Sequence, residues 1–234
     1  MRKSIQDVQA ANSPSDLVES QTDDAGLVQR RRAQIVQAAV KLFSEQGFYK
    51  TTVQQIAAQA EISHGLIYHY ARTKEDILLL ALVSVLEGYK RELPLAIEQH
   101  QDPLDRLLAG VRAYCDVVDR SREATVLAYR STKSLPERQR QHIKQLEIET
   151  NQLIEECVQA CIDAGYFRQV DVALTVYHFV NFAHAWALKH WRLATLTDKE
   201  AYIRDGFDFF LRALVTPKGW RRYQKLAEIS TTAK

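Results

Sequence analysis

Two short helix-forming segments, separated by only three residues, are the feature that most restricts how this chain can fold. Thr52 is a favoured N-cap residue. The apolar residues that follow it recur at helical steps and form one face: Val53, Ile56, Ala57 and Ala60. The connection Glu61-Ile62-Ser63 is short enough to require a tight turn, and Ser63 can cap a second helix over about 64–71. The segment therefore predicts a helix-turn-helix.

Helical periodicity also dominates the rest of the chain. Before the motif, a helix is expected over about 28–46, with one apolar stripe: Ile35, Ala38, Ala39, Leu42 and Phe43. Gly47 suits a left-handed C-cap, and Phe48 suits the hydrophobic contact of a Schellman motif. After the motif, Thr73 and Asp76 can start a long helix that Pro94 ends or kinks. Further helices are expected at about 103–119, 122–133, 136–164, 171–192 and 198–214.

No segment shows the sustained alternation of a β-strand, so the predicted fold class is all-α. A three-helix head with the helix-turn-helix is expected at 27–74, and a larger helical body at 75–218. Residues 1–26 are rich in Ser, Asn, Gln and Asp and read as a flexible N-terminal tail. Residues 219–234, which follow Pro217, read as a C-terminal tail.

Charge is concentrated in one part of the chain. Residues 28–74 hold seven Lys or Arg against two Asp or Glu, although the whole chain has a net charge of only +2. This surplus suits a polyanion partner such as DNA. Arg30, Arg31 and Arg32 either contact the DNA backbone or are solvated.

The sequence argues against several other classes of protein. No apolar run is long enough to span a bilayer and the first residues lack a signal peptide, so a cytoplasmic protein without membrane contact is expected. Cys157 and Cys161 are four residues apart but lack further ligands nearby, which favours buried thiols over a metal site. Two Glu-x-x-His motifs on facing helices, a Gly-x-Ser-x-Gly elbow and a Gly-rich phosphate loop are absent. The expectation is therefore no enzyme, no cofactor and no metal.

In a helix-turn-helix, the N-terminal residues of the second helix meet base edges in the major groove. Three side chains of this helix are expected to point outward: His64, Leu66 and His69. Histidine can hydrogen-bond a purine edge, and leucine suits a thymine methyl. Gly65 lets the backbone approach DNA closely. Hydroxyl and ammonium groups that can contact phosphates are carried by Tyr68, Tyr70 and Lys74.

The same residues resemble the TetR family of bacterial repressors. The match comprises Thr52, Ile56-Ala57, Ala60, Ile62-Ser63, Gly65, Ile67-Tyr68, Tyr70 and Lys74. The resemblance implies that phosphates are held by Thr52, Tyr68, Tyr70 and Lys74. It implies that bases are faced by His64, Gly65, Leu66 and His69, with Ser63 at the start of their helix. Two residues depart from the pattern: Glu61 stands where glycine is common, and Ala71 replaces the usual Phe.

The resemblance also implies a body that binds a small molecule and dimerises through its last two long helices. Helix 171–192 is apolar on nearly all sides, which favours a subunit interface over an intrachain core. One face of this helix carries Tyr177, Asn181, His184, Leu188 and Trp191. Its polar residues either belong to a ligand site or are satisfied within the core. Tyr114 and Tyr129 are further candidates to line the ligand site.

The body is similar in length and pattern to TetR members that sense acyl-CoA thioesters. On that similarity, the CoA phosphates would meet Arg130, Lys133, Arg138 and Arg140, which otherwise form a solvated connection. The expected function is a homodimeric repressor that a small-molecule effector, such as an acyl-CoA, releases from a palindromic operator. The alternative is an activator or an architectural DNA binder without a small ligand.

Overall fold

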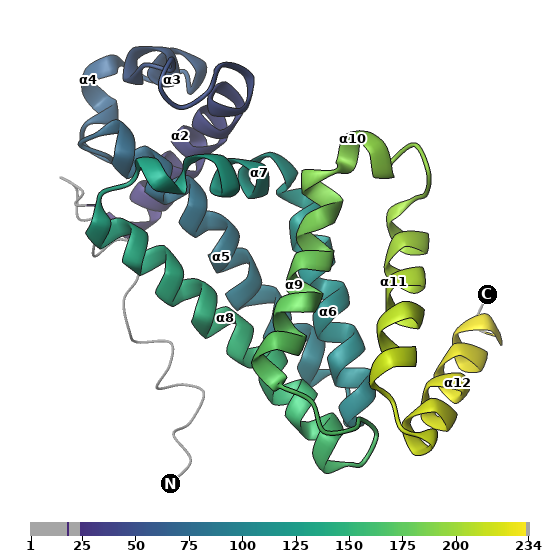
Figure 1. Ribbon diagram of the computed structural model, residues 1–234. Helices are drawn as coiled ribbons and strands as arrows, with labels where there is room; N and C mark the ends of the chain where they lie inside the picture. Colours follow the sequence, from purple (N-terminus) through teal and green to yellow (C-terminus); the bar gives the residue numbers. More distant parts are fainter. Residues whose placement is uncertain (1–17, 19–23, 233–234) are drawn as a thin grey trace, which may run out of the picture. The chain divides into compact units, whose positions relative to one another are not determined.

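The computed structural model describes residue 18 and residues 24–232 (Figure 1). Within them the chain is helical, its extended pairing is limited to a single bridge between Phe167 and Val215, and no helix has the length and apolarity to cross a membrane. The predicted all-α class is confirmed. The long helices are α2 (Ala25–Gln46), α5 (Lys74–Glu98), α6 (Pro103–Arg120), α8 (Glu137–Asp163), α9 (Val172–Leu188), α11 (Lys199–Leu214) and α12 (Pro217–Thr232). The shorter ones are α3 (Val53–Gln59), α4 (His64–Ile67), α7 (Arg122–Ser131), the 3₁₀ turn η2 (Thr132–Ser134) and α10 (His190–Leu193).

The helices form two compact units. The first unit contains the described residues up to Ser84 together with Val126–Lys144. The second unit contains Val85–Thr125 and the described residues from Gln145 onward. The domain bounds expected from the sequence, 27–74 and 75–218, stay a prediction. The expected N-terminal tail falls almost entirely outside the described residues.

In the first unit, α2 buries the stripe that its sequence predicts. Its buried residues include Ile35, Ala38, Ala39, Leu42 and Phe43. Gly47 ends the helix at φ 84° and its N–H donates to the Phe43 carbonyl at 3.0 Å. Phe48 is buried, with its ring centroid 5.2 Å from that of Phe43. Glycine ends the helix with a positive φ, as predicted, but its ψ of 154° is not that of the left-handed cap of a Schellman motif. The predicted hydrophobic contact of Phe48 is confirmed. The chain then continues into α3, which lies beside α2 (Figure 1).

The start of α5 is fixed by a reciprocal cap. The Thr73 hydroxyl accepts from the Asp76 backbone N–H at 3.0 Å, and the Asp76 carboxylate accepts from the Thr73 N–H at 3.0 Å. The predicted Thr73 cap is confirmed. Pro94 does not end the helix, because α5 continues to Glu98 and buries Leu93 and Ile97 on either side of the proline. Packing of these side chains offsets the hydrogen bond that proline removes.

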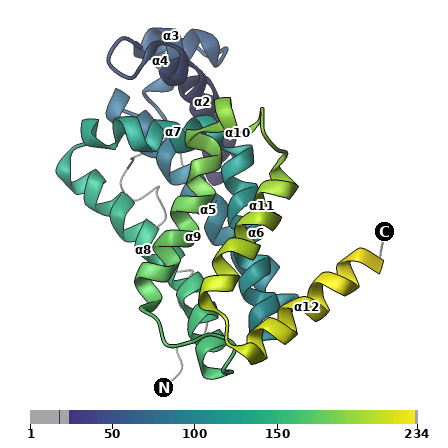
Figure 2. The same ribbon diagram turned by 45° about the vertical axis from the view of Figure 1, so that its right-hand side comes forward.

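In the second unit, α9 packs along α6, and α11 lies beside both helices (Figure 2). Two glycines allow this close packing. A Cβ at Gly110 in α6 would lie 3.0 Å from the Ile154 side chain of α8 and 3.1 Å from Ile97 of α5. A Cβ at Gly206 in α11 would lie 2.2 Å from the Phe182 ring of α9. That ring instead stacks on Tyr202, with their centroids 4.5 Å apart.

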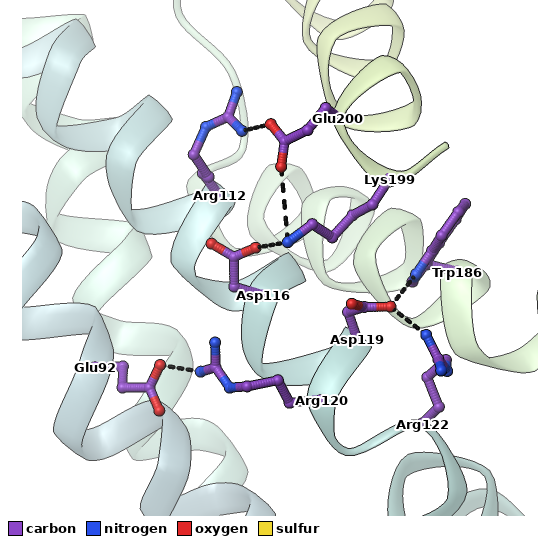
Figure 3. A network of polar contacts seen from close by, with 9 residues as sticks. All are labelled: Glu92, Arg112, Asp116, Asp119, Arg120, Arg122, Trp186, Lys199 and Glu200. Carbon is purple, nitrogen blue, oxygen red and sulfur yellow. Dashed lines mark hydrogen bonds and ion pairs between the residues drawn. The ribbon is translucent and has the colours of Figure 1, made fainter. Parts of the chain in front are cut away.

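A network of polar contacts holds α6 to its neighbours in the second unit (Figure 3). Asp119 accepts a hydrogen bond from Trp186 Nε1 at 2.7 Å and pairs with Arg122 at 2.5 Å. Burial acts to raise the pKa of Asp119, but the hydrogen bonds from Trp186 and Arg122 outweigh it and lower that pKa. Asp116 pairs with Lys199 of α11 at 2.5 Å, and this hydrogen bond raises the pKa of Lys199. The remaining pairs of the network are Arg112 with Glu200, Lys199 with Glu200, and Arg120 with Glu92.

Two expectations about the C-terminal half are corrected. The helix expected over 171–192 ends at Leu188, and a short helix, α10, follows after Lys189. The tail expected over 219–234 is instead occupied by α12 up to Thr232. The Thr216 hydroxyl accepts from the Gly219 N–H at 3.2 Å, and Arg222 pairs with Asp102 at 3.0 Å and Asp105 at 2.7 Å. Asp102 and Asp105 lie more than a hundred residues before Arg222, so local sequence does not indicate these two ion pairs.

Candidate functional site

The first helix of the motif, α3, begins at a capping box. The Thr52 hydroxyl accepts from the Gln55 backbone N–H at 3.2 Å, and the Gln55 side-chain oxygen accepts from the Thr52 N–H at 2.8 Å. These two bonds satisfy groups that a helix start otherwise leaves open. The prediction that Thr52 caps this helix is confirmed, and its side chain stays at the surface.

The turn between α3 and α4 is a Schellman motif with an acidic residue in the left-handed position. The Glu61 N–H donates to the Ala58 carbonyl at 3.1 Å, and the Ile62 N–H donates to the Ala57 carbonyl at 3.0 Å. Glu61 lies at φ 54°, a conformation that glycine adopts at lower cost. Glu61 therefore adopts, at some strain, the conformation for which the family pattern commonly has glycine.

The second helix, α4, presents several of its predicted contact residues to solvent. The Ser63 hydroxyl accepts from the Leu66 N–H at 3.2 Å and thereby starts the helix, as predicted. The exposed residues are Ser63, His64, Gly65, Tyr68 and His69, whereas Leu66 is half-buried and Ile67 is buried. The Tyr68 hydroxyl lies 3.3 Å from His64 Nε2, so these two exposed side chains form a pair. The helix is shorter than expected, because α4 ends at Ile67.

Gly65 has open space where a side chain would stand. A Cβ built at this position has no atom within 4 Å. The folded protein therefore does not need glycine here for packing. Glycine lowers helix stability by about 1 kcal/mol relative to alanine. A partner that approaches the backbone closely at this face would explain why glycine stands at position 65.

Tyr70 is buried, which corrects its predicted role as a phosphate contact. Its residue exposure is 3%, and its carbonyl accepts from Arg32 Nε at 3.2 Å. Arg32 is itself buried and also donates to the Val18 carbonyl. Burial lowers the pKa of Arg32, although the nearby charge of Asp76 acts to raise it. Tyr70 and Arg32 therefore hold the first unit together from inside, and hydrophobic packing explains why the motif places an aromatic residue at this position.

Lys74, predicted to contact a phosphate, has structural partners within the first unit. Its ammonium donates to the carbonyls of Phe48 at 2.9 Å, Tyr49 at 3.3 Å and Thr51 at 3.0 Å. It also lies 4.5 Å from the centroid of the Phe48 ring. An ammonium has three donors, and all three are used by the loop that precedes α3. Lys74 therefore fixes that loop.

Tyr49 is a surface residue that sequence reasoning missed. Its side chain is 81% exposed, and its hydroxyl accepts from the Ser134 hydroxyl at 3.1 Å. It stands in the loop directly before Thr52. Its partner in η2 is 85 residues away along the chain, so local sequence could not indicate this arrangement.

In the second unit, three aromatic side chains from different helices form a polar cluster, in which the two tyrosines are buried and the histidine is half-buried. Tyr89 of α5 and Tyr114 of α6 stack with ring centroids 4.0 Å apart. Both hydroxyls lie 3.4 Å from Nε2 of His184 in α9. Burial lowers the pKa of His184 from 6.5 to about 4, so this imidazole is neutral at pH 7. The structure brings together the predicted residues Tyr114 and His184, and adds Tyr89.

The other candidates on helix 171–192 face elsewhere. Tyr177 is 41% exposed, Trp191 is 76% exposed, and the exposed Asn181 donates to the Tyr177 carbonyl. The buried stripe of α9 consists of Thr175, Val176, Phe179, Val180, Ala183, Trp186 and Ala187. His184 lies at the edge of this stripe, whereas Tyr177 and Asn181 are turned further from it. Trp191 belongs to α10, beyond the end of α9.

The basic candidates belong to the first unit. Tyr129, Arg130, Lys133 and Arg138 are exposed. Arg140 is not free, because it donates to the carbonyls of Lys133 and Leu135 at 3.4 Å and pairs with Glu137. These contacts fix the turn at η2. The structure therefore places the predicted effector residues in two units.

Family models match both parts of the chain. The model described as "Bacterial regulatory proteins, tetR family" matches residues 35–81, which include the helix-turn-helix. The model described as "Tetracyclin repressor-like, C-terminal domain" matches residues 100–191. Together they match more than half of the chain.

Relatives and solved structures agree with these matches. The chain is 48% identical to the HTH-type transcriptional regulator HbdR of Aromatoleum sp. (strain CIB) over 88% of this chain and 90% of that protein. It is 27% identical to the HTH-type transcriptional repressor KstR2 of Mycobacterium tuberculosis, over 71% of this chain and 84% of that protein. It shares the fold of AibR, solved in complex with isovaleryl coenzyme A and operator DNA, with a TM-score of 0.65 at 21% identity, covering 76% of this chain and 95% of AibR. The chain therefore belongs to the TetR family of bacterial regulatory proteins.

Proposed function

We propose that this TetR-type transcriptional regulator is a homodimeric repressor that binds a palindromic operator and is released by an acyl-CoA thioester. The observation that carries the DNA-binding part is the exposed face of α4 and of the turn that follows it. His64, Gly65, Tyr68 and His69 are all at the surface, although Ile67, the last residue of α4, is fully buried. A short helix that is anchored by one apolar residue and presents polar and small residues is suited to the major groove.

Exposed apolar residues on α9 and α11 support the homodimer. Leu174 is 62% exposed and Tyr177 is 41% exposed on α9, and Phe209 is 73% exposed on α11. Exposed apolar side chains mark a protein interface where they form a contiguous patch. A second copy also supplies the second helix-turn-helix that two half-sites about 34–36 Å apart require.

The acyl-CoA part of the proposal is supported by the fold likeness to AibR and by the tyrosine–histidine cluster. AibR was solved with isovaleryl coenzyme A and operator DNA. Tyr89, Tyr114 and His184 offer uncharged polar groups inside the second unit, which suit an acyl group rather than a phosphate. The predicted phosphate contacts of Arg130, Lys133 and Arg138 stay a prediction.

Fluorescence anisotropy with labelled DNA selected in vitro for binding tests the DNA-binding part. If each of two helix-turn-helix motifs makes about four phosphate contacts, the log–log salt slope is about −7. The double variant with His64→Ala and Tyr68→Ala should lose at least tenfold in affinity. His100→Ala, which removes an exposed histidine after α5, should change nothing. Equal affinity of the double variant and the wild type would contradict the proposal.

The same complex tests release. Acyl-CoA thioesters added to the operator complex should lower operator affinity by about 5- to 150-fold, the usual range of coupling between two sites. An architectural protein would stay bound at every thioester concentration. An activator would show the same or higher affinity with ligand, and both results would contradict repression by release.

A further inference from the structure

The buried face of α8 contains two polar residues among its apolar ones. Thr150 is 1% exposed and Asn151 is 2% exposed, and they lie between the buried residues Leu146 and Ile154. The Thr150 hydroxyl donates to the Leu146 carbonyl at 2.8 Å, so it is satisfied within its own helix. The Asn151 side chain is different. Neither its amide nitrogen nor its amide oxygen has a hydrogen-bond partner among the described residues.

An asparagine side chain offers two donors and an oxygen that can accept two hydrogen bonds. Proteins satisfy nearly all such groups when they are buried, because an unpaired buried amide lowers stability. A leucine has a similar size and would fill this position without that cost. The amide at position 151 therefore indicates a partner that is not part of this chain.

Contacts within the second unit place Asn151 near the level of the tyrosine–histidine cluster. Lys90 of α5 pairs with Glu149 of α8 at 2.7 Å, joining these two helices. Tyr89, the neighbour of Lys90, is in the cluster with His184, and Asn151 lies two residues after Glu149. The ion pair therefore brings the cluster's part of α5 alongside the part of α8 that carries Asn151.

The polar groups at this level do not favour an anion. Tyr89, Tyr114 and Asn151 are uncharged, and burial keeps His184 neutral by lowering its pKa to about 4. Glu147, one turn before Asn151, is an acid whose pKa is raised by burial. A carboxylate or phosphate would lack a compensating charge among these groups, whereas a hydroxyl or carbonyl could pair with the amide.

We propose that Asn151 determines effector specificity by hydrogen-bonding a hydroxyl group on the acyl part of the effector. This inference rests on the proposed function and goes further, because it states that a plain hydrocarbon acyl group is a poor effector. A site that pairs a buried amide with a ligand hydroxyl rejects the analogue that lacks it.

The test measures how well acyl-CoA thioesters, supplied in matched pairs, release the protein from operator DNA. Straight-chain, branched and aromatic acyl groups are each used with and without one hydroxyl, for example isovaleryl-CoA and 3-hydroxyisovaleryl-CoA. For wild type, the hydroxylated member of at least one pair should act at a concentration at least tenfold lower. Asn151→Leu should remove this preference. Gln152→Leu, the same kind of change at the exposed next residue, should keep it.

A melting temperature without ligand adds a second readout. Asn151→Leu should melt at the same or a higher temperature than wild type, because it removes an unpaired amide. A clear fall would show that the amide is satisfied within the folded protein, for example by buried water, and would overturn the inference. Equal response of wild type to both members of every pair would also overturn it, while leaving the proposed function intact. Failure of every thioester to release wild-type protein would instead overturn the acyl-CoA proposal on which the inference rests.

Discussion

Replacing Gly65 with alanine separates a requirement for DNA binding from a requirement for folding. The structure has no atom within 4 Å of a Cβ at this position, so the added methyl group meets no obstacle in the free protein. Alanine is favoured over glycine inside a helix by up to about 1 kcal/mol. The free energy of unfolding of Gly65→Ala should therefore stay the same or rise by at most about 1 kcal/mol.

On DNA the same methyl group should act in the opposite direction. If the backbone at Gly65 approaches the groove closely, a methyl group must push α4 away from the bases. We expect operator affinity to fall at least tenfold, which corresponds to about 1.4 kcal/mol. Affinity for unrelated DNA should fall less, since phosphate contacts from other residues remain.

Two assays measure these effects on the same protein samples. Urea unfolding gives the stability, and fluorescence anisotropy gives the affinity for operator and unrelated DNA. A stability gain together with an affinity loss supports the close approach. Operator affinity within twofold of wild type would refute the reasoning, and so would a loss of stability, because the open space around Gly65 would then have been misjudged.

Four further substitutions test other parts of the structure. Glu61→Gly should raise the free energy of unfolding by about 1 kcal/mol in urea titrations, because glycine adopts the left-handed conformation at φ 54° without strain; an unchanged midpoint would contradict this. Because burial lowers the pKa of His184 from 6.5 to about 4, the unfolded chain takes up this proton at a higher pH than the folded one. Stability that is present above pH 6.5 is then lost as the pH falls toward 4. Wild type should therefore lose about 1.5 kcal/mol more than His184→Gln between pH 6.5 and pH 5, and parallel curves of stability against pH would refute this. Asp119→Ala should cost about 1–3 kcal/mol by leaving the buried Trp186 N–H unpaired, and less in a Trp186→Phe background, as measured by urea unfolding. Lys74→Met should lower the melting temperature, because it frees three loop carbonyls; an effect on DNA affinity alone would instead favour a phosphate contact.

The elements that could be predicted from sequence are those specified by nearby residues. The stripe of α2, its end at Gly47 and the caps at Thr52, Ser63 and Thr73 all depend on spacings of a few residues. Helix periodicity and side-chain capping are local effects, so the order of the main helices followed from them. The family resemblance added the expectation that the α3–α4 segment binds DNA.

The features that could not be predicted depend on contacts between distant parts of the chain. Lys74 donates to carbonyls 23 to 26 residues earlier, a structural contact that the sequence pattern did not indicate. Tyr70 is buried, and its carbonyl accepts a hydrogen bond from Arg32, 38 residues earlier. The cluster around His184 combines three helices, and its neutral charge state results from burial that the sequence pattern does not report.

Position-specific DNA cleavage tests the central claim, that α4 lies in the major groove, most directly. An iron chelate attached to His69→Cys would cut DNA near the residue. The native thiols are unsuited to labelling, since Cys115, Cys157 and Cys161 are buried and burial raises the pKa of each. Lys225→Cys in α12 provides an exposed control. The account predicts two symmetric cleavage centres about one helical turn apart, or a multiple of it, from position 69 alone. Uncut operator, or equal cleavage from position 225, would contradict it.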